Sequence, residues 1–366
     1  MTGTPALELA GVSKSFNNIP ALLPLDLSLP EGELLAVLGP SGCGKTTTLR
    51  IIAGFEAPDA GTVRIGGRDV TRLPPNKRGL GMVFQNYSLF PHMTVAENVG
   101  FGLRMRGQGA AARAERVGAM LDLVRLGGTG DRGVHELSGG QQQRIALARA
   151  LAPGPRILLL DEPLGALDKN LREGMQFELR QIQRRMGITS ILVTHDQEEA
   201  LTMSDRVAVM QGGRVVQSGP PTEVYDTPRT RFVAEFLGTA NVLGGTVQGR
   251  EGAHWVVDLA PGRGTVHEAH GTARAADHLQ LAPGHGVSLA VRPERLRIGP
   301  VTEGNLVATV VDVVFRGSSF AYELRLPNWG GQELFAYTQD RVPAGPGDTV
   351  GLSWAPGAAV VLEDGL

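Results

Sequence analysis

The chain has 366 residues, of which 42% are hydrophobic and 20% charged, and its formal net charge is -2. These values are ordinary for a globular protein that is long enough for two domains. The near-neutral balance excludes the strong basic field with which proteins hold nucleic acid, so we expect no nucleic-acid partner. A single cysteine, Cys43, excludes an internal disulfide and fits a reducing compartment.

We also expect no direct crossing of a membrane. The N-terminus lacks the basic stretch and apolar run of a signal peptide, and no segment approaches the roughly 18 uninterrupted apolar residues that span a bilayer. Any role at a membrane is therefore expected to run through a partner protein.

The first half of the chain alternates short apolar runs with helical segments. Strands are predicted at 6–9, 34–38, 157–160 and 190–193, and a helix at 46–52. Repeated strand–turn–helix order predicts an α/β domain with a mostly parallel sheet. Between about 92 and 155 the pattern becomes helical, with helices predicted at 111–124 and 139–151. We interpret this stretch as a helical insertion.

The pattern changes near Gly238. From there to Leu366, short alternating segments are separated by Gly and Pro, and strands are predicted at 287–292, 307–315, 321–326 and 333–337. This pattern predicts a small all-β domain, a barrel. We place the domain boundary between 237 and 238, giving domains 1–237 and 238–366.

A glycine-rich segment follows the 34–38 run and fits G-x-x-x-x-G-K-[ST]: Gly39-Pro40-Ser41-Gly42-Cys43-Gly44-Lys45-Thr46. Small residues let backbone N–H groups close around phosphate oxygens, and the following helix points its positive end at the same anion. Lys45 adds charge at the β- and γ-phosphates, and Thr46 offers a hydroxyl to Mg²⁺. The predicted cofactors are ATP and Mg²⁺. The ATP contacts are predicted at Gly39, Ser41, Gly42, Cys43, Gly44, Lys45, Thr46 and Thr47.

Two readings of this segment compete. An incidental glycine-rich turn is the alternative to a nucleotide site, and the strand before the segment and the helix after it favour the nucleotide. Cys43 is interpreted as a small residue of the loop rather than as a redox centre.

The apolar run at 157–160 ends in the acidic pair Asp161 and Glu162. A carboxylate at the end of a strand beside the phosphate loop can hold Mg²⁺, which we predict for Asp161. The next carboxylate can polarise the attacking water as general base, which we predict for Glu162. Taken alone, such a pair more often marks a strand that meets solvent.

The segment 135–144 resembles the signature motif of ABC ATPases: His135-Glu136-Leu137-Ser138-Gly139-Gly140-Gln141-Gln142-Gln143-Arg144. It precedes the acidic pair, as in that family, and the resemblance extends from about residue 7 to about residue 235. Ser138 and the two glycines at a helix start form a second anion-binding N-terminus, although a plain helix cap is the alternative. ATP contacts are expected at Ser138, Gly139, Gly140 and Gln141. The resemblance implies a P-loop NTPase (RecA-like) core with a helical subdomain.

The resemblance implies three further positions in the catalytic region. Gln85 matches the Q-loop glutamine, which senses Mg²⁺ and the attacking water. His195 matches the switch histidine, which contacts the γ-phosphate. Asp168 matches the D-loop aspartate, although Gly165 stands where the family often has serine.

The resemblance also places Phe16 where the family stacks an aromatic ring on adenine. Tyrosine is the commoner residue there, and phenylalanine keeps the π-face that stacking needs. A phenylalanine of the hydrophobic core is the alternative.

In the family, two such domains form a head-to-tail sandwich around ATP. The resemblance therefore implies a homodimer, bound to transmembrane permease subunits and working with a periplasmic or lipid-anchored substrate-binding protein. The expected location is peripheral, at the cytoplasmic face of the inner (plasma) membrane. Residues 86–91 are the candidate docking groove for the permease, with a buried loop as the alternative.

The second domain resembles the OB-like, TOBE-like barrel of importers, in the segments 291–294 and 315–326. Sensing and dimerisation are both open as its role. The string 164–173 and the layout resemble most closely the spermidine/putrescine import ATPases, with ferric iron, aminoethylphosphonate and sugar importers as alternatives.

Two other classes of protein are less favoured. A soluble ABC ATPase acting on nucleic acid or the ribosome commonly has two cassettes or coiled-coil insertions, and neither is present in the sequence. A degenerate regulatory module is disfavoured by Lys45, Asp161, Glu162 and His195.

Overall fold

The computed structural model describes residues 4–165, 167–259, 270–274, 279–303 and 306–363. The chain divides into two compact units, 1–221 and 222–366. The boundary placed from the sequence, between 237 and 238, comes after two short helices, α7 (Pro221–Asp226) and α8 (Arg231–Phe236). The division of the chain assigns these helices almost entirely to the second unit.

The first unit contains a six-stranded sheet in the order β10-β9-β3-β8-β7-β6. Its strands are β3 (Leu34–Leu38), β6 (Leu80–Val83), β7 (Ile157–Asp161), β8 (Thr189–Thr194), β9 (Arg206–Gln211) and β10 (Arg214–Gly219). All neighbours pair in parallel except β10, which is an antiparallel edge. Every residue of β3 and β8 is buried, as the unbroken apolar runs of central parallel strands predict.

A second, antiparallel sheet has the order β2-β1-β4-β5. Its strands are β1 (Leu7–Phe16), β2 (Ile19–Leu29), β4 (Ala60–Ile65) and β5 (Arg68–Asp69). The β1–β2 hairpin turns through Asn17 and Asn18, with φ of 50° and 64°, the left-handed pair that a tight hairpin requires. One hydrophobic core unites both sheets with α1 (Lys45–Ala53). Each fully buried leucine or isoleucine in it contributes about 1.5–3 kcal/mol.

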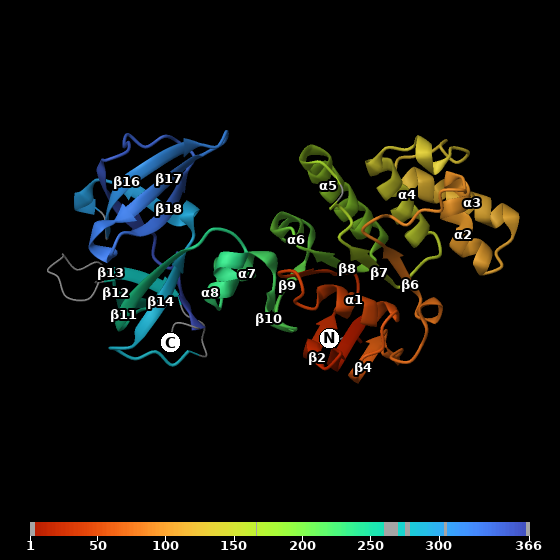
Figure 1. Ribbon diagram of the computed structural model, residues 1–366, viewed down its shortest axis with the longest axis horizontal. Helices are drawn as coiled ribbons and strands as arrows, with labels where there is room; N and C mark the ends of the chain where they lie inside the picture. The colour runs from red at the N-terminus through yellow and green to blue at the C-terminus, as the bar shows by residue number, and fades with distance from the viewer. Residues whose placement is uncertain (1–3, 166, 260–269, 275–278, 304–305, 364–366) are drawn as a thin grey trace. The chain divides into compact units, whose positions relative to one another are not determined.

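Three helices lie between β6 and β7 in the chain: α2 (Val95–Met105), α3 (Ala110–Leu123) and α4 (Gly139–Leu151). Figure 1 shows them together at one end of the unit, beyond β6. Two further helices, α5 (Lys169–Met186) and α6 (Gln197–Met203), follow β7 and β8. Short 3₁₀ turns occupy Pro75–Lys77 and Val134–Glu136.

After α7 and α8, the second unit is built from β-strands and short 3₁₀ turns. A closed barrel joins β11 (Asn241–Glu251), β12 (His254–Asp258), β13 (His270–Arg274), β14 (Gly286–Val291) and β20 (Ala359–Leu362). A five-stranded sheet joins β15 (Leu296–Gly299), β16 (Leu306–Phe315), β17 (Phe320–Leu326), β18 (Gln332–Thr338) and β19 (Thr349–Trp354). Short 3₁₀ turns lie at Pro293–Arg295, Val301–Glu303 and Pro327–Trp329. The predicted fold class, an α/β core followed by all-β sheets with a barrel, is confirmed.

Arg292 anchors α7 and α8 within the second unit. Its guanidinium donates to the carbonyls of Tyr225 and Ala234, at 3.1 and 2.7 Å, and stacks on the Tyr225 ring.

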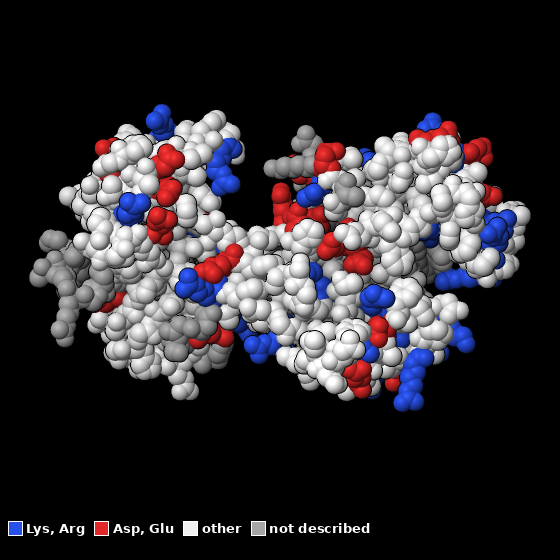
Figure 2. All heavy atoms as spheres, viewed as in Figure 1, with Lys and Arg blue, Asp and Glu red and all other residues white. Residues whose placement is uncertain are grey.

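Acidic and basic side chains are interspersed on the face of the protein that Figure 2 shows.

Candidate nucleotide site

Four predicted segments follow the carboxyl ends of neighbouring parallel strands in the first unit. Leu38 of β3 pairs with Thr194 of β8, and Val193 of β8 pairs with Asp161 of β7. Strand β6, which precedes Gln85, pairs with β7 on the other side. Because the carboxyl ends of parallel strands share one edge, the glycine-rich loop, the acidic pair, His195 and Gln85 come to the same edge of the sheet.

The glycine-rich loop is shaped by close backbone contacts. A Cβ on Gly39 would lie 2.4 Å from the carbonyl oxygen of Met210, and one on Gly44 would lie 2.8 Å from that of Ala21. Gly44 caps α1 with a left-handed φ of 106°. Glycine is required at these positions, and the loop delivers its N–H groups and the α1 N-terminus to one point, the arrangement that binds phosphate.

Lys45 is the first residue of α1 and only 7% exposed. Its ammonium donates to the carbonyls of Gly39 at 2.7 Å and Pro40 at 3.0 Å, so the charge lies inside the loop. Cys43 is buried in the hydrophobic core below the loop, which fits the interpretation of it as a packing residue. The remaining predicted contacts are exposed or half-buried at the loop: Ser41, Gly42, Thr46 and Thr47.

The carboxylate of Glu162 is where three predicted catalytic residues meet. Gln85 Nε2 donates to Glu162 Oε2 at 2.9 Å, and His195 Nδ1 lies 3.2 Å from Glu162 Oε1. Glu162 has a left-handed φ of 45°, a conformation that costs a non-glycine residue about 1–3 kcal/mol. Its N–H donates to the carbonyl of Val193 at 2.9 Å, which holds this strained residue between β7 and β8.

Asp161, one residue earlier, is half-buried. Burial raises the pKa of its carboxyl, the neighbouring charge of Glu162 raises that pKa further, and Arg50 lowers it. Two adjacent charged carboxylates at a partly buried edge repel each other, and a bound cation would offset that repulsion. Asp161, the amide oxygen of Gln85 and the hydroxyl of Thr46 all offer oxygen ligands, the type that Mg²⁺ prefers, so these residues fit that ion.

The signature residues make a separate helix N-terminus. Ser138 Oγ accepts from Gln141 N–H at 3.4 Å, and Gln141 Oε1 accepts from Ser138 N–H at 3.0 Å, a capping box at the start of α4. Gly139 and Gly140 form the first turn. Over the described part of the chain, no hydrogen bond joins these four residues to the glycine-rich loop.

Asp168 caps α5, because its carboxylate accepts from Leu171 N–H at 3.0 Å; Ala166 lies outside the described residues. Arg172, one turn further along α5, is a functional residue that no motif in the sequence indicates. Its guanidinium donates to the carbonyl of Leu167 and to the carboxylate of Asp196, both at 3.0 Å. Arg172 therefore joins the Asp168 segment to the residue that follows His195. No pattern in the sequence marks these partners of Arg172.

A buried carboxylate, Glu199, lies close to the segment that contains His195, and no motif in the sequence indicates it. Glu199 is 2% exposed and accepts from Thr194 Oγ1 at 2.6 Å. That hydroxyl in turn accepts from Asp196 N–H at 2.9 Å. The buried carboxylate thus fixes the backbone on both sides of His195.

Replacing Glu199 by Gln is expected to raise the melting temperature at about pH 8, with a gain that shrinks as the pH falls. Burial raises the pKa of Glu199, so the stability that its neutral form gives is lost as the pH rises through the folded-state pKa. Glutamine keeps an oxygen that can accept from Thr194. Calorimetry across the pH range measures the effect, and a difference that does not vary with pH would contradict this account.

Phe16 ends β1 and is 44% exposed, so it is not a core residue. The ammonium of Lys14 lies 5.4 Å from its ring centroid. Its hairpin also contains Ala21, whose carbonyl lies against Gly44 of the loop. An aromatic ring is therefore exposed on the hairpin that packs against the glycine-rich loop.

Comparison with known proteins decides the family. The model described as ABC transporter matches residues 22–165, and the TOBE domain model matches residues 289–362. A spermidine/putrescine import ATP-binding protein PotA from Frankia alni is 49% identical over 99% of this chain and 80% of that protein. PotA from Thermobifida fusca is 48% identical (98% and 94% covered), and PotA from Mesorhizobium japonicum 45% identical (98% and 98%). The chain belongs to the ATP-binding proteins of ABC transporters.

Solved structures agree with this assignment. The structure of cbiO1 from Clostridium perfringens, part of the ABC transporter complex cbiONQ, has a TM-score of 0.57 and 29% identity over 60% of this chain and 90% of that one. A dimeric, post-hydrolysis structure of the ATP-binding cassette MJ0796 bound to ADP and Pi has a TM-score of 0.52 and 32% identity, covering 59% and 98%. The predicted ABC ATPase, with ATP binding and hydrolysis coupled to transport, is confirmed.

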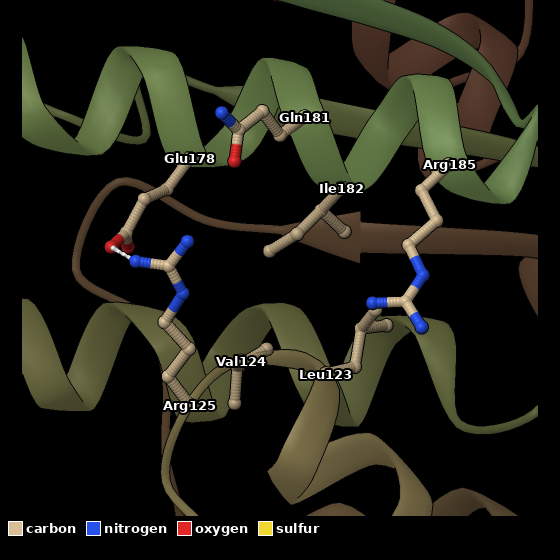
Figure 3. Close-up of a pocket in the computed structure, with 7 residues that line it drawn as sticks. All are labelled: Leu123, Val124, Arg125, Glu178, Gln181, Ile182 and Arg185. Carbon is tan, nitrogen blue, oxygen red and sulfur yellow. Dashed lines mark hydrogen bonds and ion pairs between the residues drawn. The ribbon is translucent and has the colours of Figure 1, made fainter.

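A small cavity of 90 Å³ in this ABC ATPase lies between α5 and the end of α3 (Figure 3). Arg125 Nη1 donates to Glu178 Oε1 at 3.3 Å across it, and Arg144 of α4 pairs with the same carboxylate at 2.9 Å. Ligand pockets are typically about 300–1,000 Å³, so this cavity is too small for a nucleotide. Glu178 instead fastens the signature helix α4 to α5.

Among the described helices of the chain, none is both long and apolar enough to cross a membrane.

Proposed function

We propose that this ABC ATPase drives the import of spermidine and putrescine by hydrolysing ATP between two copies of the chain. Support for the cargo comes from the relatives named for spermidine/putrescine import, which are 45–49% identical over nearly the whole chain. The nucleotide site is the same whatever the cargo, so uptake measurements decide between polyamines and the ferric iron, aminoethylphosphonate and sugar alternatives.

The meeting of Gln85 and His195 on the carboxylate of Glu162 carries the mechanism. Glu162 acts as general base and takes the proton of the attacking water. Gln85 and His195 hold the carboxylate in place, and His195, 63% exposed, can also reach the γ-phosphate. Positioning of this kind is the main catalytic contribution in phosphoryl transfer.

The phosphates lie on the N–H groups of the loop from Gly39 to Gly44, with Lys45 at the β- and γ-phosphates and Thr47 in the first turn of α1. Phe16 stacks on the adenine. Thr46, Gln85 and Asp161 would hold Mg²⁺, which when bound offsets the charge that develops on the phosphates.

Two copies complete the site. Ser138, Gly139, Gly140 and Gln141 make an anion-binding helix N-terminus. Among the described residues it has no hydrogen bond to the glycine-rich loop of its own chain, which supports its use on the ATP of a second copy. The solved dimer of a similar cassette supports the same arrangement. Asp168 lies at the same junction in this proposal. Its backbone carbonyl accepts from Arg172 N–H at 2.9 Å, and the guanidinium of Arg172 donates to Asp196.

The further partners are permease subunits, with a periplasmic or lipid-anchored substrate-binding protein, at the cytoplasmic face of the inner membrane. In the segment 86–91, Asn86, Ser88 and Pro91 are exposed and Tyr87 is buried. The exposed residues are the proposed permease contact. For the second unit, sensing and dimerisation both remain candidate roles.

The proposal is tested by removing the gene from its host and measuring the uptake of labelled spermidine and putrescine. Wild-type protein is expected to restore uptake, and Glu162→Gln, which keeps the fold, is expected to fail. Ferric iron, aminoethylphosphonate and sugar uptake are measured in the same strains. Normal polyamine uptake in the deleted strain, with loss of one of the other cargoes, would overturn the polyamine assignment.

A further inference from the structure

The segment that follows Gln85 has an unfavourable backbone. Tyr87 and Ser88 are consecutive non-glycine residues in the left-handed region, with φ of 59° and 48°. Residues with a Cβ keep this conformation only where their surroundings impose it. Tyr87 is 6% exposed, and its buried hydroxyl has no hydrogen-bond partner, so its own side chain does not supply that constraint through hydrogen bonding.

Arg149, in the last turn of α4, supplies the constraint that holds Tyr87 and Ser88 in the left-handed region. Its Nη2 donates to the carbonyl of Tyr87 at 2.7 Å, and its Nη1 donates to the carbonyl of Ser88 at 2.6 Å. The guanidinium also lies 5.5 Å from the ring centroid of Phe90. A planar fork with parallel donors fits two adjacent carbonyls, and the single ammonium of a lysine does not.

The far end of the same segment is held by α2. Asn98 is fully buried, its Oδ1 accepts from Phe90 N–H at 2.8 Å, and its Nδ2 donates to the Phe90 carbonyl at 3.1 Å. The near end is Gln85, which donates to Glu162. Residues 85–90 therefore run from the catalytic carboxylate to the helices α2 and α4.

Helix α4 has the signature residues at its first turn and Arg149 at its last. A regular helix moves as a rigid rod over this length, so a displacement of Ser138 is passed to the carbonyls of Tyr87 and Ser88. We propose that Arg149 is a positioning residue that clamps the segment after Gln85 and, through α4, links the signature end of a subunit to its own Glu162. In the proposed head-to-tail dimer, the signature end contacts one ATP and Glu162 acts on the other, so the link would connect the two ATP sites. This connection rests on the proposed dimer, whereas the clamp does not.

The clamp is tested by hydrogen exchange of the amides at 86–90 in the full chain without nucleotide. Arg149→Lys keeps the charge and loses the fork, and is expected to speed exchange there by about tenfold, the loss of one charged hydrogen bond. The matched control is Arg116→Lys on α3, because Arg116 donates to the carbonyl of Ala152 at 3.1 Å rather than to this segment. Equal exchange at 86–90 in wild type and Arg149→Lys would overturn the clamp.

The link is tested in a Glu162→Gln background, in which ATP is expected to bind and to be hydrolysed far more slowly. Addition of ATP is expected to slow exchange at 86–90 when Arg149 is present. It is expected to leave that exchange unchanged in Arg149→Lys, although the dimer still forms on a sizing column. Equal protection in both proteins would overturn the link. If ATP forms no dimer in either protein, the head-to-tail proposal and the link fail together, and the nucleotide-free comparison still decides the clamp.

Discussion

Replacing Glu162 by Gln is expected to lower the rate of ATP hydrolysis by a factor of about 10²–10⁴, the usual contribution of a general base. The amide has the shape of the carboxylate, so Gln85 and His195 keep a polar partner, and the proton acceptor alone is lost. ATP binding is expected to stay within about twofold of wild type, because Glu162 is placed against water and not against the triphosphate. Phosphate release at saturating ATP and binding of a fluorescent nucleotide measure the two quantities.

Glu198→Gln is the matched control for charge. Glu198 is exposed in the first turn of α6, close to the site in sequence and outside the proposed catalytic set. Its turnover is expected to equal that of wild type. Hydrolysis by Glu162→Gln at the wild-type rate would remove Glu162 from the catalytic role.

Replacing Lys45 by Met is expected to weaken ATP binding by about 10–100-fold, the value of hydrogen bonds from a charged donor. The ammonium is buried in the glycine-rich loop, where low solvent exposure strengthens its attraction for phosphate. Methionine keeps the length of the side chain and loses the charge. Equilibrium titration with labelled ATP measures the dissociation constant.

Lys77→Met makes the same change at an exposed lysine of the turn Pro75–Lys77 and is expected to bind ATP as wild type does. Melting temperatures of both variants show whether the fold is retained. Equal affinity in Lys45→Met and wild type would contradict the placement of the triphosphate.

The sequence predicted the parallel core well, because each central strand is a short apolar run and each motif follows such a run. The meeting of Gln85, Glu162 and His195 follows from parallel pairing, once β6, β7 and β8 are known to be neighbours. The left-handed backbone conformation of Glu162 could not be predicted from the neighbouring residues in the sequence, because it depends on the hydrogen bond from its N–H to the carbonyl of Val193 on another strand.

Side-chain links between distant segments could not be predicted. Arg149, Arg172 and Glu199 have the sequence pattern of ordinary helix residues. Arg149 donates to backbone carbonyls, Arg172 donates to the carboxylate of Asp196, and Glu199 accepts from the hydroxyl of Thr194. Nothing in helical periodicity marks such partners.

The second unit was predicted as β from its alternating segments, and the barrel was expected. Its closure, in which β13 and β20 pair in parallel, could not be predicted, because alternation sets the face of a strand but not its neighbour. The five-stranded sheet beside the barrel was not foreseen for the same reason.

In the proposed dimer, ATP is bound between the glycine-rich loop of one copy and the signature helix of another. The most direct test of this arrangement is the molar mass of Glu162→Gln with and without ATP, measured by light scattering on a sizing column. Gly139→Asp in the same background is the matched variant: a Cβ at Gly139 meets only Leu167, at 3.8 Å, so its own chain tolerates the change. The new carboxylate would face the partner's phosphates. We expect ATP to raise the dimer fraction of Glu162→Gln and to leave that of the double variant unchanged. No rise with ATP, or an equal rise in both proteins, would contradict the shared site.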